Sequence, residues 1–281
     1  MTFKSKKIAS RVVDIGSLAI IIFFAALVLF PLWWIFRSSL MTNPEIGSLR
    51  FFPSRWLFSN YIGALKDFHY FKYLFNTMVI VVPCVVFGTT TAIMCGYSFA
   101  RLYFPGRKFV FSLCIASMLL PPMVTLIPLY IGWVRFLGLG GTYWPLILPF
   151  LCGGGAFNIF LMRQFIMTIP RELDEAAMID GAGRMRILTQ IIIPSIKPAI
   201  VVVALFIFLQ IWNDVLQQTV YITKSEMYTI ALGLKQFNGS YGTDWKYAMA
   251  STCLSILPGV IIYLIGQKHF IEGIVMTGMK N

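Results

Sequence analysis

Charged side chains are scarce in this chain. Only 12% of its 281 residues are charged, whereas 58% are hydrophobic, and the mean hydropathy is +0.78. Because an average soluble domain carries roughly 25% charged residues, this composition excludes an ordinary soluble protein and predicts a membrane protein. No polar stretch is long enough for a separate cytoplasmic domain, so we expect one transmembrane domain to cover residues 1–281.

Residues that carry metal or nucleophilic chemistry are also few. His69 and His269 lie far apart in the sequence, and none of the five cysteines forms a CxxC pair, so we predict no metal site. No nucleophile and base stand at a credible spacing, which argues against an intramembrane enzyme. The phosphate-binding pattern GxxxxGK[ST] is absent, so we expect neither ATP nor another cofactor on this chain.

Long apolar runs are what the sequence does contain. A membrane-spanning helix needs about 20 mostly apolar residues. Windows that meet this demand predict an all-α, polytopic fold of about six transmembrane helices, with both termini on one side of the membrane. They are residues 16–36, 76–99, 109–132, 143–162, 199–222 and 248–267.

The formal charge of +12 predicts an orientation rather than nucleic-acid binding, because the basic residues lie between the spans. The loop at residues 37–75, which this topology places outside, is also basic. It weakens the rule that basic loops lie in the cytoplasm, without reversing the predicted orientation. This loop is rich in aromatic residues and is expected to be structured, either on its own subunit or as a docking surface. We expect both termini in the cytoplasm, on the side of Lys4, Lys6, Lys7, Arg11, Arg101, Arg107 and Lys108.

Two apolar runs are separated by a charged connector, PRELDEAAMIDGAGRMRILTQIIIP. Pro170 and the acidic residues after it suit the first turn of a helix. Leu173, Ala176 and Ala177 fall on one apolar face with little bulk, and Gly181 suits the left-handed residue that ends a helix. Such a face is typical of a helix that docks in a groove of another protein, although an ordinary amphipathic surface helix is the alternative.

This connector, residues 170–194, resembles the EAA loop of binding-protein-dependent ABC importer permeases. The spacing of Glu175-Ala176-Ala177, Gly181 and Ile193-Pro194 carries the resemblance, and Ile193 replaces the Leu usual in the family. The resemblance implies the type I importer permease fold, with this segment as the cytoplasmic coupling helix. The residues then expected to couple transport to ATP hydrolysis are Glu175, Ala176, Ala177, Asp180, Gly181 and Pro194.

Further stretches are similar to the carbohydrate, maltose-type subgroup of these permeases. The resemblance implies a sugar or oligosaccharide importer in the bacterial cytoplasmic membrane. Its implied partners are a second, different permease subunit, two ATP-binding subunits that hold ATP and Mg, an extracytoplasmic solute-binding protein and membrane lipid. A glycerol phosphate is the alternative solute. The stretches are SFARLYFPGRK at 98–108, LLPPMVTLIPLY at 119–130, WND at 212–214 and YGTDW at 241–245.

Polar residues interrupt the fifth window. Gln210, Asn213, Asp214 and Gln217 stand at i, i+3, i+4 and i+7, which predicts one polar side of a helix. An Asp at the bilayer centre costs about 2.5–3.5 kcal/mol, so Asp214 is expected to face protein or water. We hypothesise that this stripe borders the translocation pathway, with bonding to a partner subunit or to this chain as the alternative. An ion-coupled secondary transporter would have Asp214 as its candidate acid.

Prolines interrupt the third window at Pro121, Pro122 and Pro128. Each one removes a backbone hydrogen bond that neighbouring groups or water must replace. The sequence leaves open whether this bend is a kink in a packed helix or part of a pathway.

Overall fold

The computed structural model describes the backbone of residues 2–48, 50–238 and 244–278, and side chains within 14–48, 50–66, 68–237 and 244–268. Regular structure across these described ranges is helical and includes no strand, which confirms the predicted all-α class. The chain divides into two compact units, residues 1–70 with 236–255 and residues 71–235 with 256–281. The predicted basic side chains before Asp14, His269 and residues 241–243 of the YGTDW stretch lie outside the described residues.

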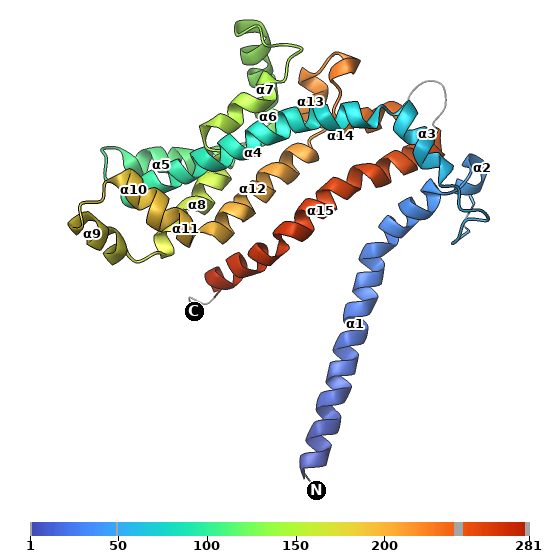
Figure 1. Ribbon diagram of the computed structural model, residues 1–281, viewed down its shortest axis with the longest axis horizontal. Helices are drawn as coiled ribbons and strands as arrows, with labels where there is room; N and C mark the ends of the chain where they lie inside the picture. Colours follow the sequence, from blue (N-terminus) through green and yellow to red (C-terminus); the bar gives the residue numbers. More distant parts are fainter. Residues whose placement is uncertain (1, 49, 239–243, 279–281) are drawn as a thin grey trace. The chain divides into compact units, whose positions relative to one another are not determined.

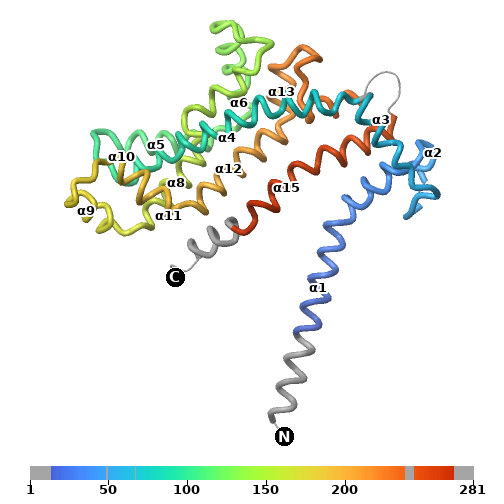
Figure 2. The backbone as a smooth tube through the Cα atoms, in the orientation of Figure 1, coloured from blue at the N-terminus to red at the C-terminus, as the bar shows by residue number. Residues whose placement is uncertain are grey.

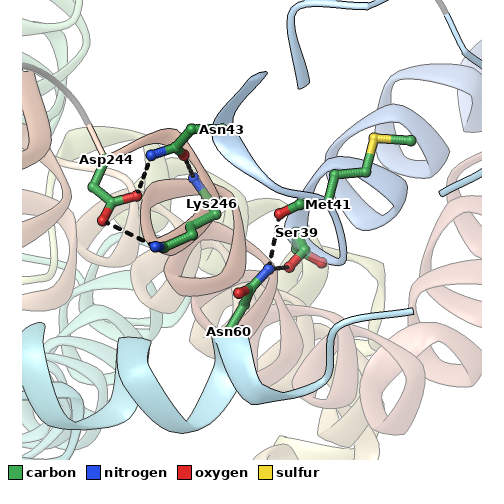
Figure 3. A network of polar contacts seen from close by, with 6 residues as sticks. All are labelled: Ser39, Met41, Asn43, Asn60, Asp244 and Lys246. Atoms are coloured by element: carbon green, nitrogen blue, oxygen red, sulfur yellow. Dashed lines mark hydrogen bonds and ion pairs between the residues drawn. The ribbon is translucent and has the colours of Figure 1, made fainter. Parts of the chain in front are cut away.

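In the first unit, residues 14–32 of α1 expose every side chain, as suits an apolar helix in lipid. Polar contacts join the end of α1 to the following segments (Figure 3). The Asn60 amide donates to the carbonyls of Ser39 and Met41, at 2.9 and 3.0 Å. The elements of this unit are α1 (Thr2–Ser39), α2 (Asn43–Ile46), α3 (Ser59–Asp67), most of η5 (Lys235–Asn238) and the first residues of α15 (Trp245–Gly278).

A second set of contacts, around Asn43, joins the segment after α1 to the start of α15 (Figure 3). Its amide donates to Asp244 Oδ1 at 2.9 Å, and its oxygen accepts from the backbone N–H of Lys246 at 2.9 Å. The long loop at residues 37–75 is therefore structured, as predicted, and at least part of it packs on its own subunit.

The second unit contains the remaining spans and the connector. Its elements are α4 (Tyr70–Arg101), α5 (Arg107–Ser117), α6 (Pro122–Tyr130), η1 (Ile131–Phe136), α7 (Trp144–Ile147), η2 (Leu148–Cys152), α8 (Ala156–Thr168), α9 (Arg171–Ile179), α10 (Arg184–Ile187), η3 (Leu188–Ile192), α11 (Ile193–Ser195), α12 (Lys197–Trp212), α13 (Leu216–Tyr221), η4 (Ser225–Met227), α14 (Ile230–Leu234) and the later residues of α15.

Six spans were predicted, and the described residues contain four helical segments that are long and apolar enough to cross a membrane, or up to six if each of two bent pairs is one span. The third window is the pair Arg107–Ser117 and Pro122–Phe136, bent by 100° at the prolines. The other pair, Arg184–Ser195 and Lys197–Trp212, is bent by 82° just before the fifth window. The four segments that qualify singly are Asp14–Ser39, Tyr70–Arg101, Trp144–Thr168 and Trp245–Lys268.

Helix α8 packs on α12 and α5 and also approaches α4 closely. A Cβ added at Gly96 would lie 2.7 Å from Met162 Cβ and 2.9 Å from the Arg163 nitrogen, so only glycine permits this approach. Met162 and Ile166 of α8 are fully buried, and so is Ile207 of α12, which packs on α8. The connector lies at one end of this unit, and α13 and α14 lie toward the other (Figure 1).

Candidate functional site

The connector begins with the short helix α9. Pro170 stands before its first residue with φ −56° and ψ 138°, which confirms the predicted start. Glu172 and Asp174 lie in the first turn, where the helix dipole favours negative charge. The chain leaves α8, turns through α9 and returns through α10 and α11 into α12 (Figure 2).

Gly181 ends α9 as predicted, with φ at +81°. Its N–H donates to the Met178 carbonyl at 3.0 Å, and the N–H of Ala182 donates to the Ala177 carbonyl at 2.9 Å. These two bonds form the Schellman motif, which satisfies carbonyls left open at a helix end. A Cβ at Gly181 would meet no atom within 4 Å, so the backbone conformation alone requires glycine here.

The outer surface of α9 is both charged and apolar. Glu175 and Ala176 are exposed and Ala177 is half-buried. Apolar side chains beside them also lack cover: Leu173 is 48%, Met178 52% and Ile179 87% exposed. The three residues predicted to form a docking face, Leu173, Ala176 and Ala177, are thus exposed or half-buried. Asp180 and Gly181 lie in the turn beside it, whereas Pro194 lies in α11 at the end of the returning limb.

One side of α9 is held from within the subunit, which the sequence did not predict. Asp174 pairs with Arg101, the last residue of α4, with Oδ2 to Nε at 2.7 Å and side chains only 9% and 6% exposed. Arg101 Nη2 also donates to the Ile169 carbonyl at 2.7 Å. Sequence reasoning assigned Arg101 to membrane orientation and Asp174 to the helix dipole. Neither signal reveals a pair between residues so far apart in the chain.

The prediction that the polar stripe occupies one continuous helix is wrong. Helix α12 ends at Trp212 and α13 begins at Leu216, so residues 213–215 turn the chain. Local hydrogen bonds accompany this break. Asn213 Nδ2 donates to the Leu209 carbonyl at 2.9 Å, and the Asn213 N–H donates to the same carbonyl at 3.2 Å. Asp214 Oδ1 accepts from the Gln217 N–H at 3.0 Å. Short polar side chains commonly compete with a helix in this way.

The break brings three of the four residues together. Gln210, Asp214 and Gln217 line a small cavity of about 20 Å³, whereas Asn213 is exposed beside it. That volume suits a single water rather than a sugar. Gln218, which the sequence pattern missed, also lines the cavity and is fully buried. Its amide donates to the Ile211 carbonyl at 3.0 Å, and its oxygen accepts from the Thr229 hydroxyl.

Comparison with known proteins identifies the family. Residues 85–275 match the model of the binding-protein-dependent transport system inner membrane component, and this match includes the whole connector. The chain belongs to this family. It is therefore a multi-pass membrane permease subunit of binding-protein-dependent transport, as the resemblance of the connector implied.

Individual relatives align over most of their length. The diacetylchitobiose uptake system permease of Streptomyces coelicolor is 31% identical, over 92% of this chain and 86% of its own. The arabinooligosaccharides transport system permease of Bacillus subtilis is 31% identical, over 94% and 96%. The maltodextrin transport system permease of the same organism is 32% identical, over 82% and 83%.

Solved structures agree on the architecture. A chain of a bacterial ABC transporter involved in import of the acidic polysaccharide alginate is 26% identical, with a TM-score of 0.82 over 93% of this chain and 98% of that one. A chain of an alginate ABC transporter in complex with a pentasaccharide-bound periplasmic protein has a TM-score of 0.66 at 18% identity, which shows the fold alone. The predicted ABC importer permease fold is thus confirmed.

Proposed function

We propose that this chain is a permease subunit of an ATP-driven importer for sugars or oligosaccharides. It forms half of the translocation pathway and docks through α9 on a separate ATP-hydrolysing subunit. The observation that carries this proposal is α9 itself, which presents Glu175, Ala176 and Met178 on an exposed surface. The sugar class is supported by relatives whose names specify diacetylchitobiose, maltodextrin and arabinooligosaccharides.

The chemistry of α9 suits a seat in a partner groove. The exposed Glu175 carboxylate offers charge-assisted hydrogen bonds to basic groups of the ATPase. Ala176 and Ala177 have little bulk and permit close approach, while Met178 and Ile179 add apolar surface. ATP and Mg belong to the partner in this arrangement, and this chain is a non-catalytic subunit.

The complete assembly that we propose contains a second, different permease chain, two ATP-binding subunits and an extracytoplasmic solute-binding protein. It lies in the bacterial cytoplasmic membrane with both termini of this chain on the cytoplasmic side. The Arg101, Arg107 and Lys108 cluster supports this orientation, because positive loops favour the cytoplasm. The connector then faces the cytoplasm, where ATP is available.

Cross-linking in the assembled transporter tests the docking surface. In a variant lacking the five native cysteines, Met178→Cys is expected to cross-link to the ATP-binding subunit. Thr223→Cys is the control, because Thr223 is also exposed but lies outside the connector, between α13 and η4. Failure of Met178→Cys to capture the ATPase in a transport-competent complex would overturn the proposed docking.

Transport in proteoliposomes tests the coupling role. Ala177→Asp places a carboxylate on the small-residue face, so we expect insertion to persist while ATP-dependent uptake falls. Ser195→Asp adds the same charge at an exposed position of α11 and is expected to leave uptake near that of the parent. Uptake that is insensitive to vanadate in the parent protein would instead favour ion coupling.

We also propose that Gln210, Asp214 and Gln217, with the neighbouring Asn213, border the solute pathway. Amide and carboxylate groups offer both donors and acceptors to sugar hydroxyls. Changing Gln210, Asn213 or Gln217 to Leu should lower uptake without loss of assembly. Thr219→Val is the control, because the exposed Thr219 hydroxyl bonds within its own helix. Normal uptake by all three leucine variants would refute the pathway role.

A further inference from the structure

The last turns of α4 contact both limbs of the connector. Tyr97 and Arg101 are one helical turn apart and lie on one face. Arg101 reaches the entering limb through Asp174 and the Ile169 carbonyl, each at 2.7 Å. The Tyr97 hydroxyl donates to the Arg184 carbonyl, at the start of the returning limb, at 3.4 Å.

Charge and burial both suit the Arg101–Asp174 pair to a fixed contact. Arg101 stands at the negative end of the α4 dipole and Asp174 near the positive end of α9. Asp174 Oδ1 and Arg101 Nε are both buried with no hydrogen-bond partner among the described residues, so the carboxylate is compensated by the positive charge of Arg101. Both side chains are more than nine-tenths buried, so solvent and salt screen the attraction between them only weakly.

The segment before α9 is also attached to α4. Gly96 brings the α4 backbone against Met162 and Arg163 of α8, and Arg163 Nε donates to the Phe99 carbonyl at 3.4 Å. Residues 96–101, the end of α4, therefore contact α8, α9 and the start of α10. The ion pair therefore gives α9 a direct contact with α4 that does not depend on the intervening chain.

We propose that Arg101 and Tyr97 are positioning residues that clamp the connector to α4, so that displacement of α9 by the ATPase becomes displacement of this span. Arg101 supplies the principal contact and Tyr97 a secondary one. The inference rests on the proposed coupling function and adds the route by which the motion enters the membrane domain.

The experiment compares Asp174→Asn and Arg101→Met with Glu172→Gln, which removes an exposed charge from the same helix. Three measurements are made. A nitroxide attached to Met178→Cys reports the mobility of α9 in the permease, and the cross-link from Met178→Cys reports docking on the ATPase. Uptake and ATP hydrolysis in proteoliposomes give the amount of solute moved per ATP. We expect the two clamp variants to show greater nitroxide mobility, a retained cross-link and about tenfold less transport per ATP. The control should match the parent in all three measurements.

If a single variant fails to insert, Arg101→Met combined with Asp174→Leu removes both buried charges at once, and such replacements are often tolerated. The double variant is expected to insert and to show the same loss of transport per ATP. Parent-like transport per ATP in any inserted clamp variant would overturn the clamp. The proposed function would instead be overturned if Met178→Cys without a clamp substitution gave no cross-link and the parent showed no ATP-dependent uptake. The two failures are therefore distinguishable.

Discussion

Substitution of Gly181 tests backbone strain without a steric clash inside this chain. Gly181 has φ +81°, and an added Cβ would meet no atom within 4 Å, so no steric clash with neighbours contributes. A non-glycine residue in the left-handed region costs about 1–2 kcal/mol, and a β-branched one more. That energy lowers the fraction of correctly turned connectors roughly 5- to 30-fold if an alternative turn competes.

The neighbouring Gly183 is a matched control. It has φ −73° and ψ 163°, a region open to any residue, and its Cβ would also meet no atom within 4 Å. We expect transport per ATP to fall least in Gly181→Asn, further in Gly181→Ala and most in Gly181→Val, because Asn tolerates the left-handed region best of the three. Gly183→Val should match the parent.

The assay is solute uptake and ATP hydrolysis in the same proteoliposomes, with insertion measured separately. Equal loss in Gly181→Val and Gly183→Val would refute the reasoning, because bulk rather than backbone conformation would then be responsible. Parent-like coupling in Gly181→Val would refute it equally.

Two further predictions concern other parts of the chain. Gly96→Ala should destabilise the second unit by about 1–3 kcal/mol through overpacking against α8, measured by thermal unfolding in detergent. Gly132→Ala should have much less effect, because its Cβ would meet no atom within 4 Å. The pKa of Glu45 is lowered because the Ser54 hydroxyl and N–H donate to its carboxylate, at 2.5 and 2.7 Å. The resulting stabilisation is present above the unfolded pKa and is lost as pH falls through the lower folded value, so proteolysis of residues 42–57 should accelerate on acidification. Ser54→Ala should weaken that pH dependence, and an unchanged profile would contradict the assignment.

Local rules predicted much of the connector. Pro170 and Gly181 have conformational preferences that act within a few residues. As expected, α9 begins directly after Pro170 and is terminated by the turn at Gly181. The spans follow from apolar length in the same way. The prediction of one polar stripe failed because periodicity assumes a continuous helix. Here the Asp214 carboxylate instead accepts the Gln217 N–H, and the chain turns between α12 and α13.

The sequence by itself determined that this protein crosses a membrane and carries a short, exposed helix between two apolar runs, because hydropathy, proline and glycine act locally. Only the tertiary structure decided what holds that helix. Arg101 and Asp174 meet at the end of α4, five residues beyond Gly96, where α8 approaches the α4 backbone closely. Such a pair depends on distances between segments remote in the chain, which no local pattern records.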